Sequence, residues 1–125
     1  METSNFQELL QNLEGFKIKF RELHWNSTTL AEHKLCDSIM QSISEFQDEI
    51  AESGFGFGFT KFENDLFFPI QQYGNNCMEI LELMDSMLIT NKYLFALNDQ
   101  FNDFISIIDS FSLEIKKFKY LSTLK

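Results

Sequence analysis

Residues 30–50 read LAEHKLCDSIMQSISEFQDEI and contain neither glycine nor proline, which predicts one long, uninterrupted helix. At about 100° of turn per residue, its apolar side chains gather on one arc. These side chains are Leu35, Cys36, Ile39, Met40, Ile43, Phe46 and Ile50. We expect this helix to run from about Leu30 to Glu52 or Ser53 and to pack this arc against the rest of the molecule.

Three further segments show the same spacing of three and four residues between apolar positions. The first is predicted to form a helix from near Ser4 or Asn5 to about Trp25, and residues 26–29 then end it and cap the next helix. Another helix is predicted from Cys77 to about Lys92. The last helix follows a short link that includes Asn98 and Asp99. Its apolar positions are Phe101, Phe104, Ile108, Phe111, Ile115 and Phe118.

The segment between the second and third helices breaks the helical pattern. Gly54, Gly56 and Gly58 are expected to end the second helix, and phenylalanines alternate with these glycines. We interpret residues 54–76 as a long crossover whose apolar side chains pack either on the bundle or on another subunit. The prediction is a single all-α domain over residues 1–125, an antiparallel four-helix bundle of ferritin-like connectivity with a long crossover between helices 2 and 3.

Composition narrows the classes of function. The formal net charge of −9 argues against nucleic acid as a partner, because an acidic surface repels phosphates. We find no secretion signal and no apolar run of about 20 residues, and therefore expect a soluble, cytoplasmic protein without a membrane partner. Cys36 and Cys77 lie on apolar faces, as buried free thiols in a reducing compartment do.

The second helix also carries potential metal ligands. His33, Asp37, Asp48 and Glu52 fall within an arc of about 100°, roughly opposite the apolar arc. Asp37 and Asp48 are about 16 Å apart along the axis at ~1.5 Å per residue, whereas one ion holds its ligands at roughly 2.0–2.2 Å. The two pairs therefore cannot serve one ion within a single chain.

Two readings of this stripe remain open. It is either a solvated acidic face or a metal site between two copies, in which antiparallel helices cross at a two-fold axis near Ser42 and Ile43. In the second case the His33/Asp37 pair of one copy meets the Asp48/Glu52 pair of the other. Mixed imidazole and carboxylate ligands suit iron, with Zn(II) or Mn(II) as substitutes.

Other chemistries lack their motifs. Neither the second nor the last helix contains Glu-x-x-His, so a di-iron centre inside the bundle is not expected. No phosphate-binding loop and no nucleophilic triad can be recognised.

The runs Leu-His-Trp-Asn at 23–26, His-Lys-Leu-Cys-Asp at 33–37 and Asp-Glu-Ile-Ala-Glu at 48–52 resemble the Dps-like mini-ferritins of the ferritin-like superfamily. Short phage-encoded ferritin-like proteins are similar as well. The resemblance implies a ferroxidase centre in which His33 and Asp37 of one subunit bind iron with Asp48 and Glu52 of its neighbour. His24 is implied as a further metal ligand, although the short connection to His33 leaves its reach open.

The same resemblance implies a function. The chain is expected to bind Fe(II), oxidise it with peroxide or dioxygen and sequester it as a two-fold dimer within a larger homo-oligomeric cage, in iron storage and oxidative stress. The place of action is the cytoplasm, or the host cytoplasm for a phage protein. The basic N-terminal tail with which some members bind DNA is absent, so no DNA binding is expected. The alternative is a non-enzymatic helical assembly or partner-binding protein with a structural or vestigial metal site.

Overall fold

The computed structural model describes residues 3–59, 74–97 and 99–124. It contains four long helices and no strand within these ranges. The helices are α1 (Thr3–Asn26), α2 (Leu30–Phe57), α3 (Cys77–Ala96) and α4 (Asn102–Ser122), and a short 3-10 turn, η1 (Asp99–Phe101), precedes α4. The predicted all-α four-helix bundle is confirmed.

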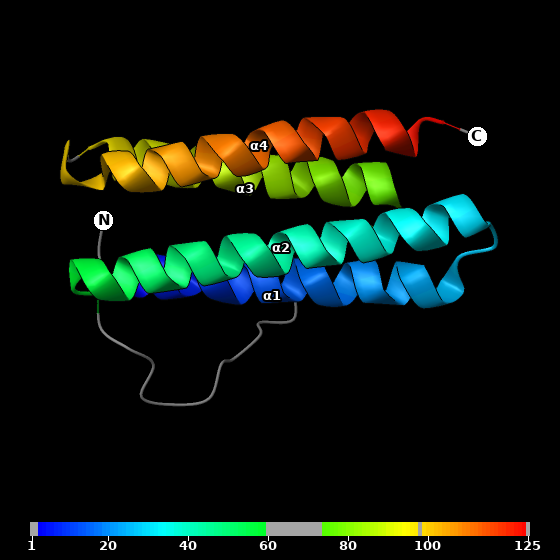
Figure 1. Cartoon of the computed structure of the whole chain (residues 1–125), viewed down its shortest axis with the longest axis horizontal. Helices are drawn as coiled ribbons and strands as arrows, with labels where there is room; N and C mark the ends of the chain where they lie inside the picture. The colour runs from blue at the N-terminus through cyan, green and yellow to red at the C-terminus, as the bar shows by residue number, and fades with distance from the viewer. Residues whose placement is uncertain (1–2, 60–73, 98, 125) are drawn as a thin grey trace.

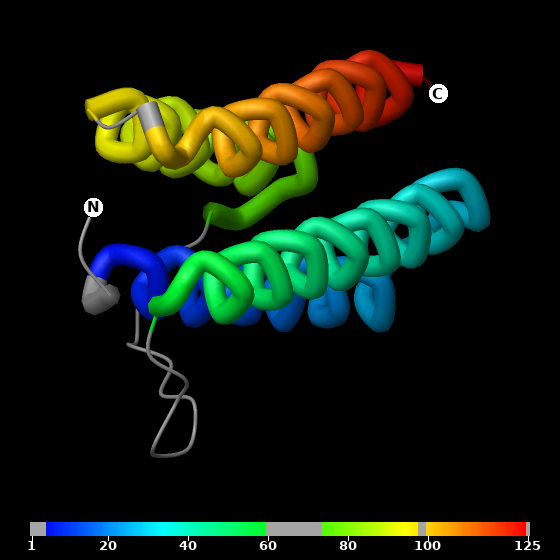
Figure 2. The backbone as a smooth tube through the Cα atoms, turned by 60° about the vertical axis from the view of Figure 1, so that its left-hand side comes forward, coloured from blue at the N-terminus to red at the C-terminus, as the bar shows by residue number. Residues whose placement is uncertain are grey.

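The helices form two layers of two (Figure 2). Helix α1 packs on α2 and α3, and α4 packs on the same two helices, so α2 and α3 occupy diagonal corners of the bundle. Neighbouring helices are antiparallel, whereas α2 and α3 run in the same direction (Figure 1). The end of α2 and the start of α3 therefore lie at opposite ends of the molecule.

Most of the apolar positions that the sequence spacing predicted are buried in the core. Leu35 and Met40 are only half-buried and pack against it, and Phe101, predicted in the last helix, is buried in η1 instead. On α2, Cys36, Ile39, Ile43, Phe46 and Ile50 are buried. The opposite face of the same helix, which carries Asp37, Asp48 and Glu52, is exposed. Amphipathic spacing thus fixed which face of each helix turned inward, because burial of apolar surface is the largest favourable term in folding.

Helix α2 is longer than predicted. It continues through Gly54 and Gly56 to Phe57, and Gly58 ends it with φ of 119° and a backbone N–H that donates to the carbonyl oxygens of Gly54 and Phe55. The predicted end at Glu52 or Ser53, with a crossover starting at residue 54, is therefore wrong. Glycine costs about 1 kcal/mol in a helix, and tertiary packing outweighs that cost here.

Aromatic packing explains the extension. Phe59 stacks on Phe6 at 4.7 Å between ring centroids, and Phe57 lies 4.7 Å from Phe101 of η1. Of the two alternatives for the Gly/Phe segment, packing on its own bundle or on another subunit, Phe57 and Phe59 adopt the first. The rest of the predicted crossover, residues 60–73, lies outside the described residues.

Helix α3 also exceeds its prediction and reaches Ala96 rather than about Lys92. Two ion pairs join α3 to α4: Lys92 lies 2.6 Å from Asp109, and Lys119 lies 3.0 Å from Asp85. Phe95, in the added turn, is fully buried and stacks on Phe104 at 4.8 Å. Packing on α4 thus stabilises the last turn of α3.

Candidate metal site at the turn between α1 and α2

A three-residue turn brings the two histidines of the chain together. Helix α1 ends at Asn26 and α2 begins at Leu30. Thr29 caps α2, since its hydroxyl accepts a hydrogen bond of 3.2 Å from the Glu32 backbone N–H. This short connection places His24, in the last turn of α1, against His33, in the first turns of α2.

The two imidazole rings form a reciprocal pair. Their centroids are 3.7 Å apart, with 24° between the ring planes. Nδ1 of His24 lies 3.0 Å from the carbonyl oxygen of His33, and Nδ1 of His33 lies 3.1 Å from the carbonyl oxygen of His24. A carbonyl oxygen can only accept, so each Nδ1 carries a proton and donates it.

Asp37 completes a cluster of three. Its Oδ1 lies 3.2 Å from Nδ1 of His24, and the His24 side chain is only 15% exposed whereas the Asp37 side chain is 60% exposed. One ligand atom from each of His24, His33 and Asp37 can be chosen so that all three lie within 4.8 Å of one another. The structure thus brings His24 to the His33/Asp37 pair, which the sequence had left open.

The protonation pattern suits metal binding. With Nδ1 donating to a backbone carbonyl, the lone pair of each neutral ring lies on Nε2, and histidines that bind metals usually have their second nitrogen engaged in this way. The carboxylate of Asp37, however, contacts the protonated Nδ1 of His24, so side chains have to rearrange before Asp37 and both Nε2 atoms can bind one ion at about 2.1 Å.

Ring orientation is the other requirement. An ion binds a ring nitrogen in the plane of that ring. Because the rings of His24 and His33 are stacked, an ion in the plane of one lies well outside the plane of the other. One of the two rings must therefore turn before both can bind the same ion.

Asp48 and Glu52 do not join this cluster within the chain. Both are exposed on α2, and Asp48 follows Asp37 by eleven residues, which is about 16 Å of helix. The structure therefore agrees that the two ligand pairs cannot share an ion in one subunit.

The outer face of α2 is strongly acidic. Its exposed charged side chains between residues 34 and 52 are Lys34, Asp37, Glu45, Asp48, Glu49 and Glu52, one cation against five anions. Trp25 and Leu30 flank the histidines and are 71% and 66% exposed.

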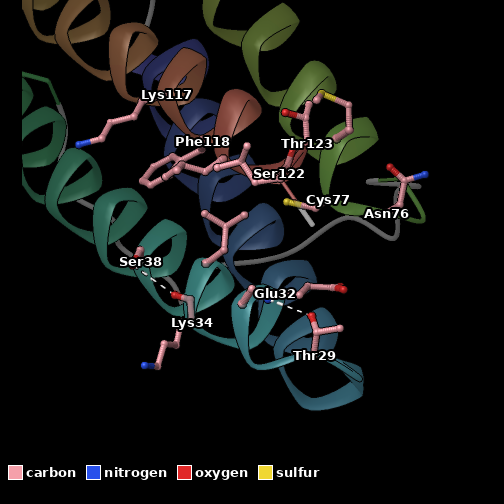
Figure 3. A pocket seen from close by; sticks show the side chains of 15 residues that line it. Thr29, Glu32, Lys34, Ser38, Asn76, Cys77, Lys117, Phe118, Ser122 and Thr123 are labelled. Atoms are coloured by element: carbon pink, nitrogen blue, oxygen red, sulfur yellow. Dashed lines mark hydrogen bonds between the residues drawn. The ribbon is translucent and has the colours of Figure 1, made fainter.

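A groove at the same end of the bundle was not foreseen from the sequence. It has a volume of about 1010 Å³ and lies between the start of α2, the start of α3 and the end of α4 (Figure 3). Leu35, Cys77 and Phe118 contribute to its lining, and Lys34 and Lys117 lie along it. No local sequence pattern predicts such a groove, because it is formed by three helix ends that are far apart in the sequence.

Cys77 lines this groove whereas Cys36 does not, and both thiols are free. Burial raises the pKa of Cys36 to about 12, with further contributions from Cys77, Glu32 and Asp37. Burial, and then Glu32, raises the pKa of Cys77 to about 11. Both groups are therefore protonated thiols near neutral pH. The prediction of a buried free thiol is confirmed for Cys36, whereas Cys77 is free but only half-buried.

No protein-family model matches this chain, and no curated protein or solved structure matches it either. Among the described residues, none of the helices is both long and apolar enough to cross a lipid bilayer.

Proposed function

We propose that the protein is a ferroxidase of the Dps-like mini-ferritin type, which binds Fe(II) between two-fold-related subunits and oxidises it. The observation that carries the proposal is the convergence of His24, His33 and Asp37 at the turn between α1 and α2. Two imidazoles and a carboxylate suit iron, and the set leaves coordination positions open for further ligands and for the oxidant.

A second copy would supply the remaining ligands. Antiparallel packing of two α2 helices about a two-fold axis at the level of Ser42 brings Asp48 and Glu52 of one copy to the His33/Asp37 pair of the other. Each dimer then has two identical sites. The exposure of Asp37, Asp48 and Glu52 supports this arrangement, because none of the three is buried in its own subunit.

The chemistry balances with peroxide as the oxidant. Two Fe(II) ions each give up one electron, the O–O bond of one peroxide breaks, and two protons are taken up to give two water molecules and two Fe(III). Carboxylates stabilise the higher charge of the product, while imidazole binds Fe(II). The role of this chain's residues is to hold the ions and to neutralise their charge.

The acidic face of α2 implies that the dimer depends on metal. Two copies of a face with five anions and one cation repel each other unless cations lie between them. We therefore expect divalent ions to promote this association and chelators to reverse it.

The first test is an Fe(II) titration with dioxygen or peroxide, followed by the near-ultraviolet absorbance of Fe(III). Asp37→Ala and Glu52→Ala are expected to reduce the initial rate by at least about 10-fold, because losing even a residue that only hydrogen-bonds to a metal ligand costs about 10- to 100-fold. Glu49→Ala is the matched control, since it removes an exposed carboxylate from the same helix but not from the proposed site. Equal rates in all three variants would refute the proposal.

Mixing the two inactive variants tests whether the site is shared. A mixed dimer of Asp37→Ala and Glu52→Ala subunits has one site with both defects and one intact site. Random assembly makes half of the dimers mixed, so about one quarter of the wild-type sites is expected to return. No recovery after the subunits have been allowed to exchange would contradict a shared site.

The reciprocal hydrogen bonds favour a second candidate, a non-enzymatic helical assembly protein. In this reading His24 and His33 serve only to join α1 to α2, since each imidazole already donates to a backbone carbonyl. Metal binding without oxidation, or no binding, together with loss of stability in His24→Ala, would favour this candidate.

A further inference from the structure

A small cleft lies between α1 and α3. It has a volume of about 220 Å³, and eight of the described residues line it, four from each helix. Five of the eight are polar and three are apolar. His24 follows Asn12, one of the lining residues, by twelve positions, or about 18 Å of helix. This α1–α3 cleft is therefore separate from the candidate metal site.

The polar side chains that α3 contributes use their donors on the backbone of α3 itself. The Oγ1 of Thr90 donates its only hydrogen to the carbonyl oxygen of Ser86 at 3.1 Å. The Nδ2 of Asn91, a residue only 9% exposed, donates to the carbonyl oxygen of Met87 at 2.9 Å. Each of these two side chains thus keeps an oxygen atom that can only accept a further hydrogen bond.

An acceptor on α1 lacks a donor. The Oδ1 of Asn12 is buried and accepts no hydrogen bond from any residue that the structure describes. A buried acceptor without a donor is unfavourable, and in most proteins such an atom has a partner. Glu8 adds an exposed carboxylate, whereas the described residues of the lining include no Lys, Arg or His. The cleft therefore favours a cationic donor, in a chain whose net charge is −9.

We propose that the α1–α3 cleft binds a short alkylammonium ion, the protonated form of a primary amine with a few carbon atoms. An ammonium group has three N–H donors and no acceptor, so it matches the oxygen atoms of Asn12, Thr90 and Asn91. Rotation about χ2, which is soft in asparagine, turns the Oδ1 of Asn12 towards the ligand. The carboxylate of Glu8 balances the positive charge, and charge-assisted hydrogen bonds are about twice as strong as neutral ones.

The apolar part of the lining favours an organic cation over a metal ion or water. Leu9 is 1% exposed and Leu94 is half-buried, and neither side chain can hydrogen-bond to water. The cleft volume of about 220 Å³ is several times the roughly 30 Å³ that one water molecule occupies in the liquid, so a single ion or water leaves most of it unfilled. A short alkyl chain packs on the two leucines while its ammonium group reaches the oxygen atoms.

The site goes beyond the proposed ferroxidase and needs no metal, so its test is done in EDTA. Butylammonium chloride is titrated into the isotope-labelled protein at neutral pH, and two-dimensional NMR follows the side-chain amide signals of Asn12 and Asn91. Both signals are expected to shift and to saturate with a dissociation constant of about 1 mM, as suits so small a ligand. Tetramethylammonium chloride, which has the same charge but no N–H donor, and KCl at equal ionic strength are expected to leave them unchanged.

Variants test the acceptor and the charge separately. Asn12→Leu keeps the size of the side chain but removes the acceptor, and it is expected to weaken binding at least about 10-fold, as loss of a hydrogen bond to a charged group does. Binding to this variant is followed at the Asn91 signal. Glu8→Gln is expected to weaken binding as well. Glu22→Gln is the matched control and should bind like the wild type, because it removes an exposed carboxylate of α1 that lies outside the cleft.

Three results would overturn the proposal. The first is no saturable shift of either asparagine signal in the wild type up to about 100 mM butylammonium, a concentration at which a millimolar site is full. The second is an equal shift with tetramethylammonium or KCl, and the third is wild-type affinity in Asn12→Leu. Because EDTA removes divalent ions, these results are independent of the ferroxidase proposal, and failure of either proposal can be recognised separately.

Discussion

Replacing Gly54 by alanine is expected to destabilise the protein, contrary to the usual rule for helices. Alanine normally gains about 1 kcal/mol over glycine inside a helix. A Cβ atom at Gly54, however, would lie 2.3 Å from both Cε2 and Cζ of Phe6 and 3.1 Å from its Cδ2. Ordinary van der Waals contacts begin near 3.4 Å, so the ring has to move by about an ångström.

The Phe6 ring has no room for this movement. It is fully buried, stacked on Phe59 at 4.7 Å and set edge-on to Phe55 at 5.6 Å. Overpacking of this kind costs about 1–3 kcal/mol, and the upper end applies because the obstructing atoms belong to a rigid ring. After the gain in helix propensity, we expect Gly54→Ala to lower the free energy of unfolding by about 2 kcal/mol.

Gly56→Ala is the matched control. Gly56 is in the same helix, two residues away, and a Cβ atom there meets nothing within 4 Å. This variant should gain about 0.5–1 kcal/mol, so the two variants should differ by about 3 kcal/mol. In thermal unfolding followed by circular dichroism, the gap is expected to be about 10 °C for a chain of this size.

Two results would refute this reasoning. One is a Gly54→Ala variant as stable as the wild type, and the other is equal stability of the two alanine variants. Adding Phe6→Leu removes the obstructing ring, so the double variant should lose less than the sum of the two single changes.

Three further predictions concern the turn, the thiols and metal binding. Folding raises the pKa of Cys36 from 9.0 to about 12 and that of Cys77 from 9.0 to about 11. The contribution of the two thiols to stability is therefore complete below pH 9 and is lost as the pH rises to about 12. Urea titrations should show this fall in the free energy of unfolding, and the fall should be shallower in a variant without the two thiols. Thr29→Ala should cost about 1 kcal/mol in chemical unfolding, since it leaves the Glu32 N–H without its cap; an unchanged midpoint would contradict the capping role. Zn(II) or Co(II) at 100 times its dissociation constant should raise the free energy of unfolding of the wild type by about 2.7 kcal/mol, which thermal unfolding would show as a higher Tm. His33→Ala should abolish this increase.

The sequence by itself was sufficient for the bundle and for the inward face of each helix. Apolar residues at spacings of three and four, as from Ile39 to Ile50, can be buried together only by a helix packed on one side. The sequence was also sufficient to exclude a metal ion bound by His33, Asp37, Asp48 and Glu52 of a single chain, because the rise of a helix is fixed at about 1.5 Å per residue. These properties are local, and they depend on neither the partners nor the angles of the helices.

Tertiary structure decided what depends on contacts distant in sequence. Gly54 remains helical because Phe6 packs on it, which no property of residues 54–58 could show. His24 reaches His33 and Asp37 because the turn aligns two helix ends, although the shortness of the connection had left this open. The groove beside Cys77 likewise depends on which helices are neighbours, and packing of the whole chain determines that.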